Sequence, residues 1–161
     1  MQHIKNLINK NILIFDVETT GLPLLKPGFF IGKDKYYDFT NNEKYDPSRI
    51  VSIAWTFVEN FDKDKLNSCD VKEYIRKPVD FFQIDNSHIH NITYEKAVND
   101  GTLLSKIIKY KGLGLAIEKC DVVIAHNCLF DLYILLNECN RLKFQNATNK
   151  LKEILDNDQY F

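Results

Sequence analysis

Residues 11–21 read NILIFDVETTG, and this stretch decides the fold. Its first part, residues 11–17, is rich in β-branched and aromatic side chains on both faces, which is typical of a central strand in a sheet. Similar stretches predict a second strand at residues 50–59 (IVSIAWTFVE) and a third at residues 71–76. Three successive strands of this kind predict a meander.

The second half of the chain is predicted to be mainly helical. The region after Thr93 turns helical, with Thr102 as a candidate N-cap for the apolar positions that follow it. Gly112 and Gly114 are expected to interrupt this helical region.

One further strand is expected inside the helical half, at residues 121–125 (DVVIA). A helix over residues 128–142 follows it at once, with apolar side chains at helical spacing, and a short helix is expected over residues 148–155. The predicted fold class is therefore α/β, a mixed β-sheet flanked by helices.

Composition limits the class of protein. The chain has 161 residues, of which 45% are hydrophobic and 27% charged, so residues 1–161 suffice for a single domain with one core. No apolar run approaches the roughly 20 residues of a membrane-spanning helix, and the N-terminus lacks a signal-peptide pattern. We expect an intracellular protein, in the cytoplasm, the nucleus or a viral factory, that is not secreted and has no membrane partner.

Charge and cysteine usage exclude two further classes. A net charge of −1 argues against a protein that coats duplex DNA through many phosphate contacts, although a site for a few nucleotides is compatible with it. The four cysteines form no C-x-x-C pair, so we expect small buried thiols in place of a zinc site or a disulfide framework.

Residues 21–47 are predicted to form a long loop insertion, because prolines and glycines concentrate there without a sustained period. Aromatic residues in this loop alternate with lysines: Phe29, Phe30, Tyr36 and Tyr37 with Lys26, Lys33 and Lys35. This pattern suits stacking on single-stranded bases beside a phosphate track. The alternative interpretation is a loop that folds its aromatic side chains onto its own domain.

Two carboxylates lie at the end of the first predicted strand. Because strand side chains alternate, Asp16 and Glu18 share one face, with α-carbons about 7 Å apart. Such a pair can converge on one hard divalent cation, whereas the simpler interpretation is a strand that becomes polar as it leaves the core. The longer pattern Asp-x-Glu-Thr-Thr-Gly, ending at Gly21, favours a functional site.

A second group of polar residues lies where the strand at 121–125 turns into a helix. It comprises His126, Asn127 and, in the first helical turn, Asp131. Taken singly, these residues are explained as turn and cap residues and as a carboxylate favoured by the helix dipole. Their joint spacing after a buried strand indicates a second part of the same site.

These two patterns, DVETTG at 16–21 and HNxxFD at 126–131, resemble the first and second motifs of the DEDD superfamily of 3′→5′ exonucleases. The segment His90-Asn91-Ile92-Thr93 is similar to the family's H-G-I-T segment, with Asn in place of Gly. The resemblance covers residues 11–142 and implies a ribonuclease-H-like fold. It also implies metal-dependent hydrolysis of phosphodiester bonds from 3′ ends, which releases nucleoside monophosphates.

The resemblance implies roles for individual residues. Asp16 would bridge two Mg²⁺ or Mn²⁺ ions, Glu18 would hold the ion that activates water, and Asp131 would support the second ion. Residues near the 3′-terminal nucleotide would be Thr19, Thr20, Gly21, Leu22, His90, Asn127 and Phe130, for which ordinary packing is the alternative role. The implied partner is a single-stranded or frayed 3′ end of DNA or RNA, and a polymerase in proofreading or DNA repair.

The family's third motif has no counterpart here. It supplies a fourth carboxylate and a His or Tyr general base. No histidine follows Asp131, and neither Tyr133 nor Tyr160 precedes an Asp at suitable spacing. Asp156 and Asp158 lie too close after the second motif to be assigned as the fourth carboxylate. Losing such a base typically removes about 10²- to 10⁴-fold of rate. Three accounts remain open: a C-terminally truncated copy of an active enzyme, a fragment, or a catalytically inactive remnant that binds nucleic acid or docks on a partner.

Overall fold

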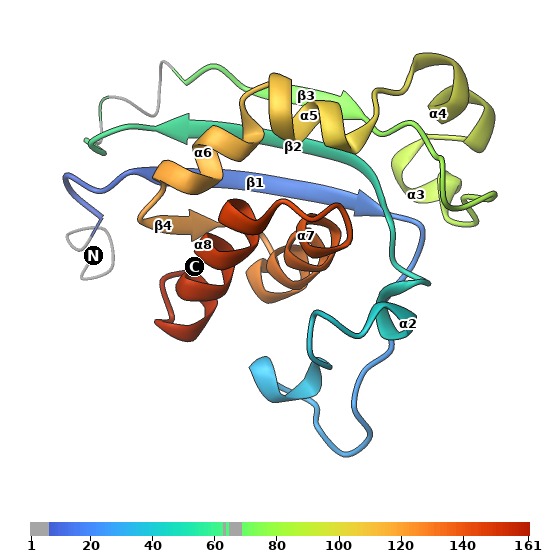
Figure 1. Ribbon diagram of the computed structural model, residues 1–161, viewed down its shortest axis with the longest axis horizontal. Helices are drawn as coiled ribbons and strands as arrows, with labels where there is room; N and C mark the ends of the chain where they lie inside the picture. The colour runs from blue at the N-terminus through green and yellow to red at the C-terminus, as the bar shows by residue number, and fades with distance from the viewer. Residues whose placement is uncertain (1–6, 63, 65–68) are drawn as a thin grey trace.

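The protein has the strands β1 (Ile12–Thr19), β2 (Ile50–Val58), β3 (Lys72–Ile75) and β4 (Val122–Ile124). These four strands form one mixed sheet in the order β3-β2-β1-β4. The structure, a computed structural model, describes residues 7–62, 64 and 69–161. Strand β1 pairs antiparallel with β2 and parallel with β4, and β2 pairs antiparallel with β3 (Figure 1).

The predicted meander and mixed sheet are confirmed, and β1 extends two residues beyond its predicted end, through Thr19. The chain also continues the sheet beyond β4. Tyr160 forms an isolated parallel bridge with Val123, whose N–H donates to the Gln159 carbonyl at 3.1 Å. The last residues of the chain therefore lie along the outer edge of β4.

Helices lie between and after the strands along the chain. Two short elements, η1 (Lys33–Lys35) and α2 (Asn42–Tyr45), lie within residues 21–47. After β3 come α3 (Ser87–His90), α4 (Tyr94–Asp100), α5 (Leu104–Tyr110) and α6 (Leu113–Lys119). After β4 come α7 (Cys128–Arg141) and α8 (Gln145–Asp156). Within the described ranges, no helix combines the length and hydropathy needed to cross a membrane.

The start of α5 corrects one prediction. Thr102 is not its N-cap, since the helix begins after Leu103 and has no side-chain cap. The Thr102 backbone instead extends the pairing beyond β3, because its N–H donates to Ile75 and its carbonyl accepts from Lys77. A second correction concerns Gly114, which lies inside α6, whereas Gly112, at φ 95°, separates α5 from α6 as expected.

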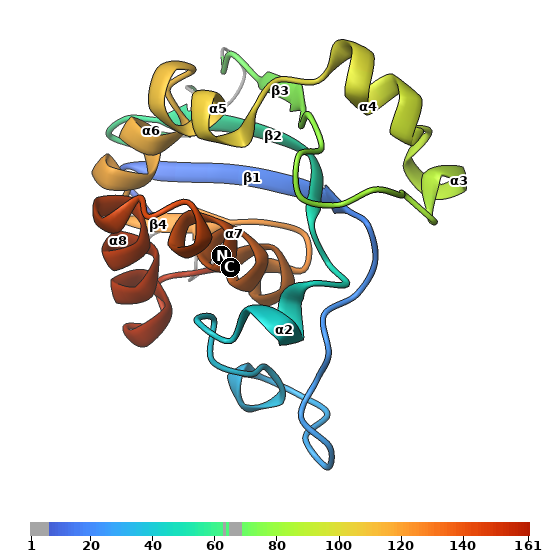
Figure 2. The same ribbon diagram turned by 45° about the vertical axis from the view of Figure 1, so that its right-hand side comes forward.

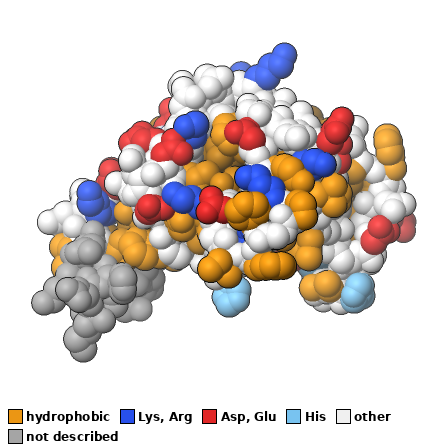
Figure 3. Space-filling model, turned by 90° about the horizontal axis from the view of Figure 1, so that it is seen from below, with side chains coloured by type: hydrophobic (Ala, Val, Ile, Leu, Met, Phe, Trp, Pro, Cys, Tyr) orange, Lys and Arg blue, Asp and Glu red, His pale blue; other side chains and the backbone are white. Residues whose placement is uncertain are grey.

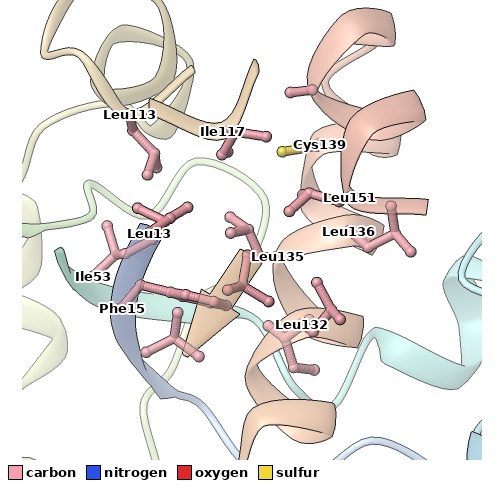
Figure 4. Close-up of a cluster of buried hydrophobic side chains, with 14 of the residues drawn as sticks. Leu13, Phe15, Ile53, Leu113, Ile117, Leu132, Leu135, Leu136, Cys139 and Leu151 are labelled. Carbon is pink, nitrogen blue, oxygen red and sulfur yellow. The ribbon is translucent and has the colours of Figure 1, made fainter. Parts of the chain in front are cut away.

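The main core lies between one face of the sheet and helices α5 to α8. Alternate residues of β1, among them Leu13 and Phe15, point to this face together with Ile53 of β2. Figure 4 shows them facing Leu135 of α7 and Ile117 of α6. Because α7 and α8 pack on each other as well as on this core, the apolar stripe predicted for residues 128–142 is confirmed as a buried face.

Three of the four cysteines lie in this core: Cys120, Cys128 and Cys139 are buried, and Cys69 is partly exposed. Burial raises the pKa of the Cys120 and Cys128 thiols to about 12. Both thiols are therefore uncharged at neutral pH, which fits their predicted role as small apolar side chains.

Candidate active site

Strand β1 sends its side chains alternately to the two faces of the sheet. Phe15 and Val17 are buried toward the helices, whereas Asp16 is exposed and Glu18 half-buried on the opposite face. The pairing with β2 becomes irregular between Glu18 and Thr19, where the strand leaves the sheet. The two carboxylates thus stand at the end of the central strand, as the alternation predicts.

Asp131 reaches the same strand from the first turn of α7. Its side chain is 3% exposed, and its Oδ1 accepts a hydrogen bond from the Val17 backbone N–H at 3.1 Å. Because β4 ends at Ile124, the N–H of Val17 on that edge of β1 has no strand partner beside it. The carboxylate satisfies this donor and is held at Val17, the residue next to Asp16 in the chain.

The surroundings of Asp131 disfavour its negative charge. Burial raises the pKa of this carboxyl to about 6; the hydrogen bond from Val17 opposes the shift, and the charge of Asp16 adds to it. Asp16 and Asp131 therefore repel each other across the edge of β1. A bound divalent cation would relieve this repulsion, and carboxylate oxygens are the donors that Mg²⁺ and Mn²⁺ prefer. These residues fit such an ion.

The complete predicted ligand set is not gathered in this conformation. Within residues 7–62, 64 and 69–161, no group of three or more His, Cys, Asp or Glu side chains is arranged to hold a metal ion. The structure brings Asp16 and Asp131 within electrostatic range of each other. Glu18 lies on the same face as Asp16, one alternation further along the strand.

Beyond β1 the chain makes a turn that is fastened by hydroxyl groups. Thr19 Oγ1 donates to the Gly21 carbonyl at 2.7 Å, and Ser48 Oγ donates to the same carbonyl. Thr20 Oγ1 donates to the Pro47 carbonyl and accepts from the Arg49 N–H, both at 2.9 Å. This turn is therefore tied to the segment that precedes β2, and the next residue, Leu22, projects outward with 75% exposure.

Helix α3 lies beside this turn, as Figure 2 shows. Asn86 Nδ2 donates to the Thr19 carbonyl at 2.8 Å, and His90 Nδ1 accepts from the Ile92 N–H at 3.2 Å. Asn86 Oδ1 and His90 Nε2 are both buried without a hydrogen-bond partner among the described residues. Buried polar atoms are rarely left unpaired, so these two are candidates for contact with a bound molecule.

Sequence reasoning missed Asn86. Its contact with Thr19 joins residues 67 positions apart, and an asparagine in a loop carries no local signal. The remaining predicted residues differ in exposure: His126 and Asn127 are exposed, and Phe130 is half-buried. His126 and Asp16 both line a mostly apolar hollow of about 440 Å³ on this face of the sheet.

A buried ion network stands behind the site. Glu138 of α7 is 1% exposed and accepts hydrogen bonds from Arg49 Nε, at 2.8 Å, and from Arg76 Nη1. Both guanidinium groups also pair with Asp80. These arginines hold the pKa of Glu138 below its usual range against the effect of burial. Sequence reasoning did not single out Glu138; its only signal is a charged residue within the apolar helix over residues 128–142.

No protein-family model and no curated protein sequence matches the chain. Solved structures do match. The fold is similar to Escherichia coli Exonuclease I in complex with a dT13 oligonucleotide, with TM-score 0.55 and 16% identity over 82% of this chain and 24% of that chain. It is also similar to the zinc-ion-bound form of the E. coli Exonuclease I–ssDNA complex, with TM-score 0.54 and 14% identity over 83% and 24%.

A third similar structure is a full-length 3′-exonuclease, with TM-score 0.51 and 12% identity over 84% of this chain and 54% of that chain. The chain thus spans about a quarter of the length of the Exonuclease I chains. At these identities the likeness shows the fold. The chain has a mixed α/β fold in which helices flank a four-stranded sheet. This fold is similar to the ribonuclease-H-like fold of exonucleases.

Proposed function

We propose that this chain is a metal-dependent 3′→5′ exonuclease that hydrolyses phosphodiester bonds at single-stranded or frayed 3′ ends of nucleic acid. The observation that carries the proposal is the meeting of Asp131 with β1 beside Asp16, 115 positions away in sequence. Support comes from the fold, which is similar to an exonuclease solved with an oligonucleotide. Nucleoside monophosphates would be the product.

Each carboxylate has a separate task in this proposal. Asp16, exposed on the sheet face, would bridge two Mg²⁺ or Mn²⁺ ions, and Glu18 would hold one of them. Asp131 would support the other while its Oδ1 stays anchored on the Val17 N–H. Such ions stabilise the attacking and leaving oxygens of a phosphodiester displacement.

The terminal nucleotide would lie at the end of β1. There the turn of Thr19, Thr20 and Gly21 is fastened by hydroxyl groups, and Leu22 projects from it. His90, Asn127 and Phe130 would flank the sugar and base; the unpartnered Nε2 of His90 supports such a contact. In this proposal the exonuclease would act beside a polymerase, in proofreading or in DNA repair.

The test is degradation of a 5′-labelled oligonucleotide with Mg²⁺, with Mn²⁺ and with a chelator. We expect shortening from the 3′ end that requires metal and that falls at least about a hundredfold in Asp16→Asn, because that change removes the bridging charge. Asp100→Asn, an exposed aspartate on α4, is the matched control and should retain full activity. No shortening with either metal would contradict the proposal.

A second candidate function is a catalytically inactive module that binds nucleic acid or docks on a partner. It is favoured by the lack of a three-residue metal cluster in the described part of the chain. This candidate predicts binding of a labelled oligonucleotide that needs no metal and survives Asp16→Asn. Wild type and Asp16→Asn, compared for cleavage and for binding, therefore distinguish the exonuclease from the inactive module.

A further inference from the structure

Residues 25–36 form a finger that projects from the molecule beyond the end of β1. An isolated antiparallel bridge joins Leu25 to Tyr36, and the Lys26 N–H donates to the Lys35 carbonyl at 2.9 Å. Gly28 at φ 83° and Gly32 at φ 68° bound the tip of the finger; such left-handed backbone favours glycine. In Figure 2 the finger hangs away from the sheet, below α2.

The tip of the finger presents three large apolar side chains to solvent. Phe30 and Ile31 are 86% and 85% exposed, and Phe29 is 50% exposed. Clusters of this kind on a protein surface usually mark an interaction site, since single exposed residues need no such explanation. In Figure 3, which views the molecule from below, orange hydrophobic side chains lie among blue Lys and Arg side chains and red Asp and Glu side chains.

The base of the finger is fixed to the helices that carry the candidate site. The Tyr36 ring stacks on Tyr133 of α7, with centroids 4.4 Å apart and planes at 15°. Lys33 Nζ donates to the Leu155 carbonyl at 3.1 Å and pairs with Asp158 at 2.7 Å. These contacts hold the base of the finger in place. Of the two interpretations of the aromatic loop, packing on the chain's own domain holds for Tyr36, whereas Phe29 and Phe30 are exposed to solvent.

The base of the finger lies on the helix that carries Asp131. Tyr36 stacks on Tyr133, which follows Asp131 by two positions on α7. Burial, and after it the charge of Asp131, raise the pKa of Tyr36 to about 12. From Tyr36 to Phe30 the chain spans at most about 20 Å. At about 3.4 Å per stacked nucleotide, a single strand that runs along the finger covers this span in roughly six nucleotides.

We propose that this finger binds the single-stranded nucleic acid several nucleotides before its 3′ end, with bases stacked on Phe29 and Phe30 and phosphates near Lys26 and Lys35. The proposal rests on the proposed exonuclease function, because that function places the 3′ end beside Asp131. Base–aromatic stacking next to lysine side chains is the usual way to hold a single strand without regard to sequence. If the apolar tip bound a membrane surface or a protein instead, it would not need single-stranded nucleic acid beside it.

The test compares a long substrate with a short one. The double variant Phe29→Ala/Phe30→Ala and a matched control, Tyr110→Ala, are assayed on a 20-nucleotide thymidine oligonucleotide and on a dinucleotide. Tyr110 of α5 is 69% exposed, so both changes remove exposed aromatic rings. For the long substrate we expect KM to rise at least about fivefold in the double variant, because one base–aromatic stack contributes about 1–3 kcal/mol.

The dinucleotide should be cleaved equally well by wild type, double variant and control, because it is too short to reach the tip. Equal changes on both substrates, or no change on either, would overturn the finger proposal while leaving the exonuclease proposal intact. If wild type cleaves nothing, fluorescence anisotropy of the labelled 20-nucleotide strand decides: weaker binding by the double variant supports the finger, and unchanged binding overturns it. Finger-dependent binding to phosphatidylserine vesicles without strand binding would also overturn it.

Discussion

At the scale of single residues, Asp131 is the group whose charge depends most strongly on the fold. Its pKa rises from 3.8 to about 6, chiefly through burial. Between about pH 4 and pH 6 the folded protein therefore holds a proton that the unfolded chain has lost. The contribution of Asp131 to stability is fully present below about pH 4 and is lost as the pH rises through about 6.

Asp131→Asn should remove this loss in the metal-free protein. The amide is isosteric with the carboxyl and still offers Oδ1 to the Val17 N–H. We expect the stability of Asp131→Asn relative to wild type, measured as the difference in the free energy of unfolding, to be larger at pH 7 than at pH 4 by at most about 3 kcal/mol. Urea unfolding in the presence of a chelator measures this difference, and a difference independent of pH would contradict the assignment.

At the scale of elements, Glu138 joins helix α7 to two strands. Its carboxylate binds Arg49 just before β2 and Arg76 just after β3, and Asp80 pairs with both arginines. The buried charges are balanced only while all partners are present, because an unpaired buried charge is strongly unfavourable. The network therefore sets where α7, and with it Asp131, meets the sheet.

Glu138→Gln should destabilise the protein by about 3–5 kcal/mol, since it leaves two buried guanidinium groups facing a neutral amide. The matched control is Glu153→Gln on α8, whose carboxylate is 56% exposed and pairs with Lys150 at 3.6 Å. That change should alter the free energy of unfolding by less than about 1 kcal/mol. Thermal or urea unfolding at neutral pH compares the two variants. Equal changes in the free energy of unfolding would show that the buried network contributes no more to stability than an exposed ion pair.

At the scale of the whole molecule, folding brings Asp16 and Asp131 together, so cation binding and stability should be linked. An ion that binds the folded state alone stabilises it by about 2.7 kcal/mol when its concentration is one hundred times the Kd. Mn²⁺ should therefore raise the thermal midpoint of wild type, in a manner that depends on concentration. The shift should vanish in Asp16→Asn and persist in Asp100→Asn.

Scanning calorimetry or dye-monitored melting measures this shift, with Ca²⁺ as a comparison ion. Equal shifts in wild type and Asp16→Asn would place the ion elsewhere on the molecule. This measurement needs no catalysis, so it tests the cation site even if the chain, which spans about a quarter of the length of the Exonuclease I chains, cleaves nothing.

The sequence by itself determined the four strands, the helix predicted over residues 128–142 and found over Cys128–Arg141, and the order in which they occur. Apolar periodicity, on which these predictions rest, is a local property. It also placed Asp16 and Glu18 on one face, since alternation along a strand needs no tertiary contact. The start of α5 was predicted wrongly because Thr102 uses its backbone in a pairing beyond β3.

Tertiary structure alone decided which distant groups meet. Asp131 binds Val17 across 114 positions, Glu138 binds Arg49 across 89, and Asn86 binds Thr19 across 67. It also decided that Tyr36 turns inward onto Tyr133 while Phe29 and Phe30 stay exposed. The physical reason is that burial and pairing depend on which elements pack together, and packing is a property of the whole chain that no local pattern contains.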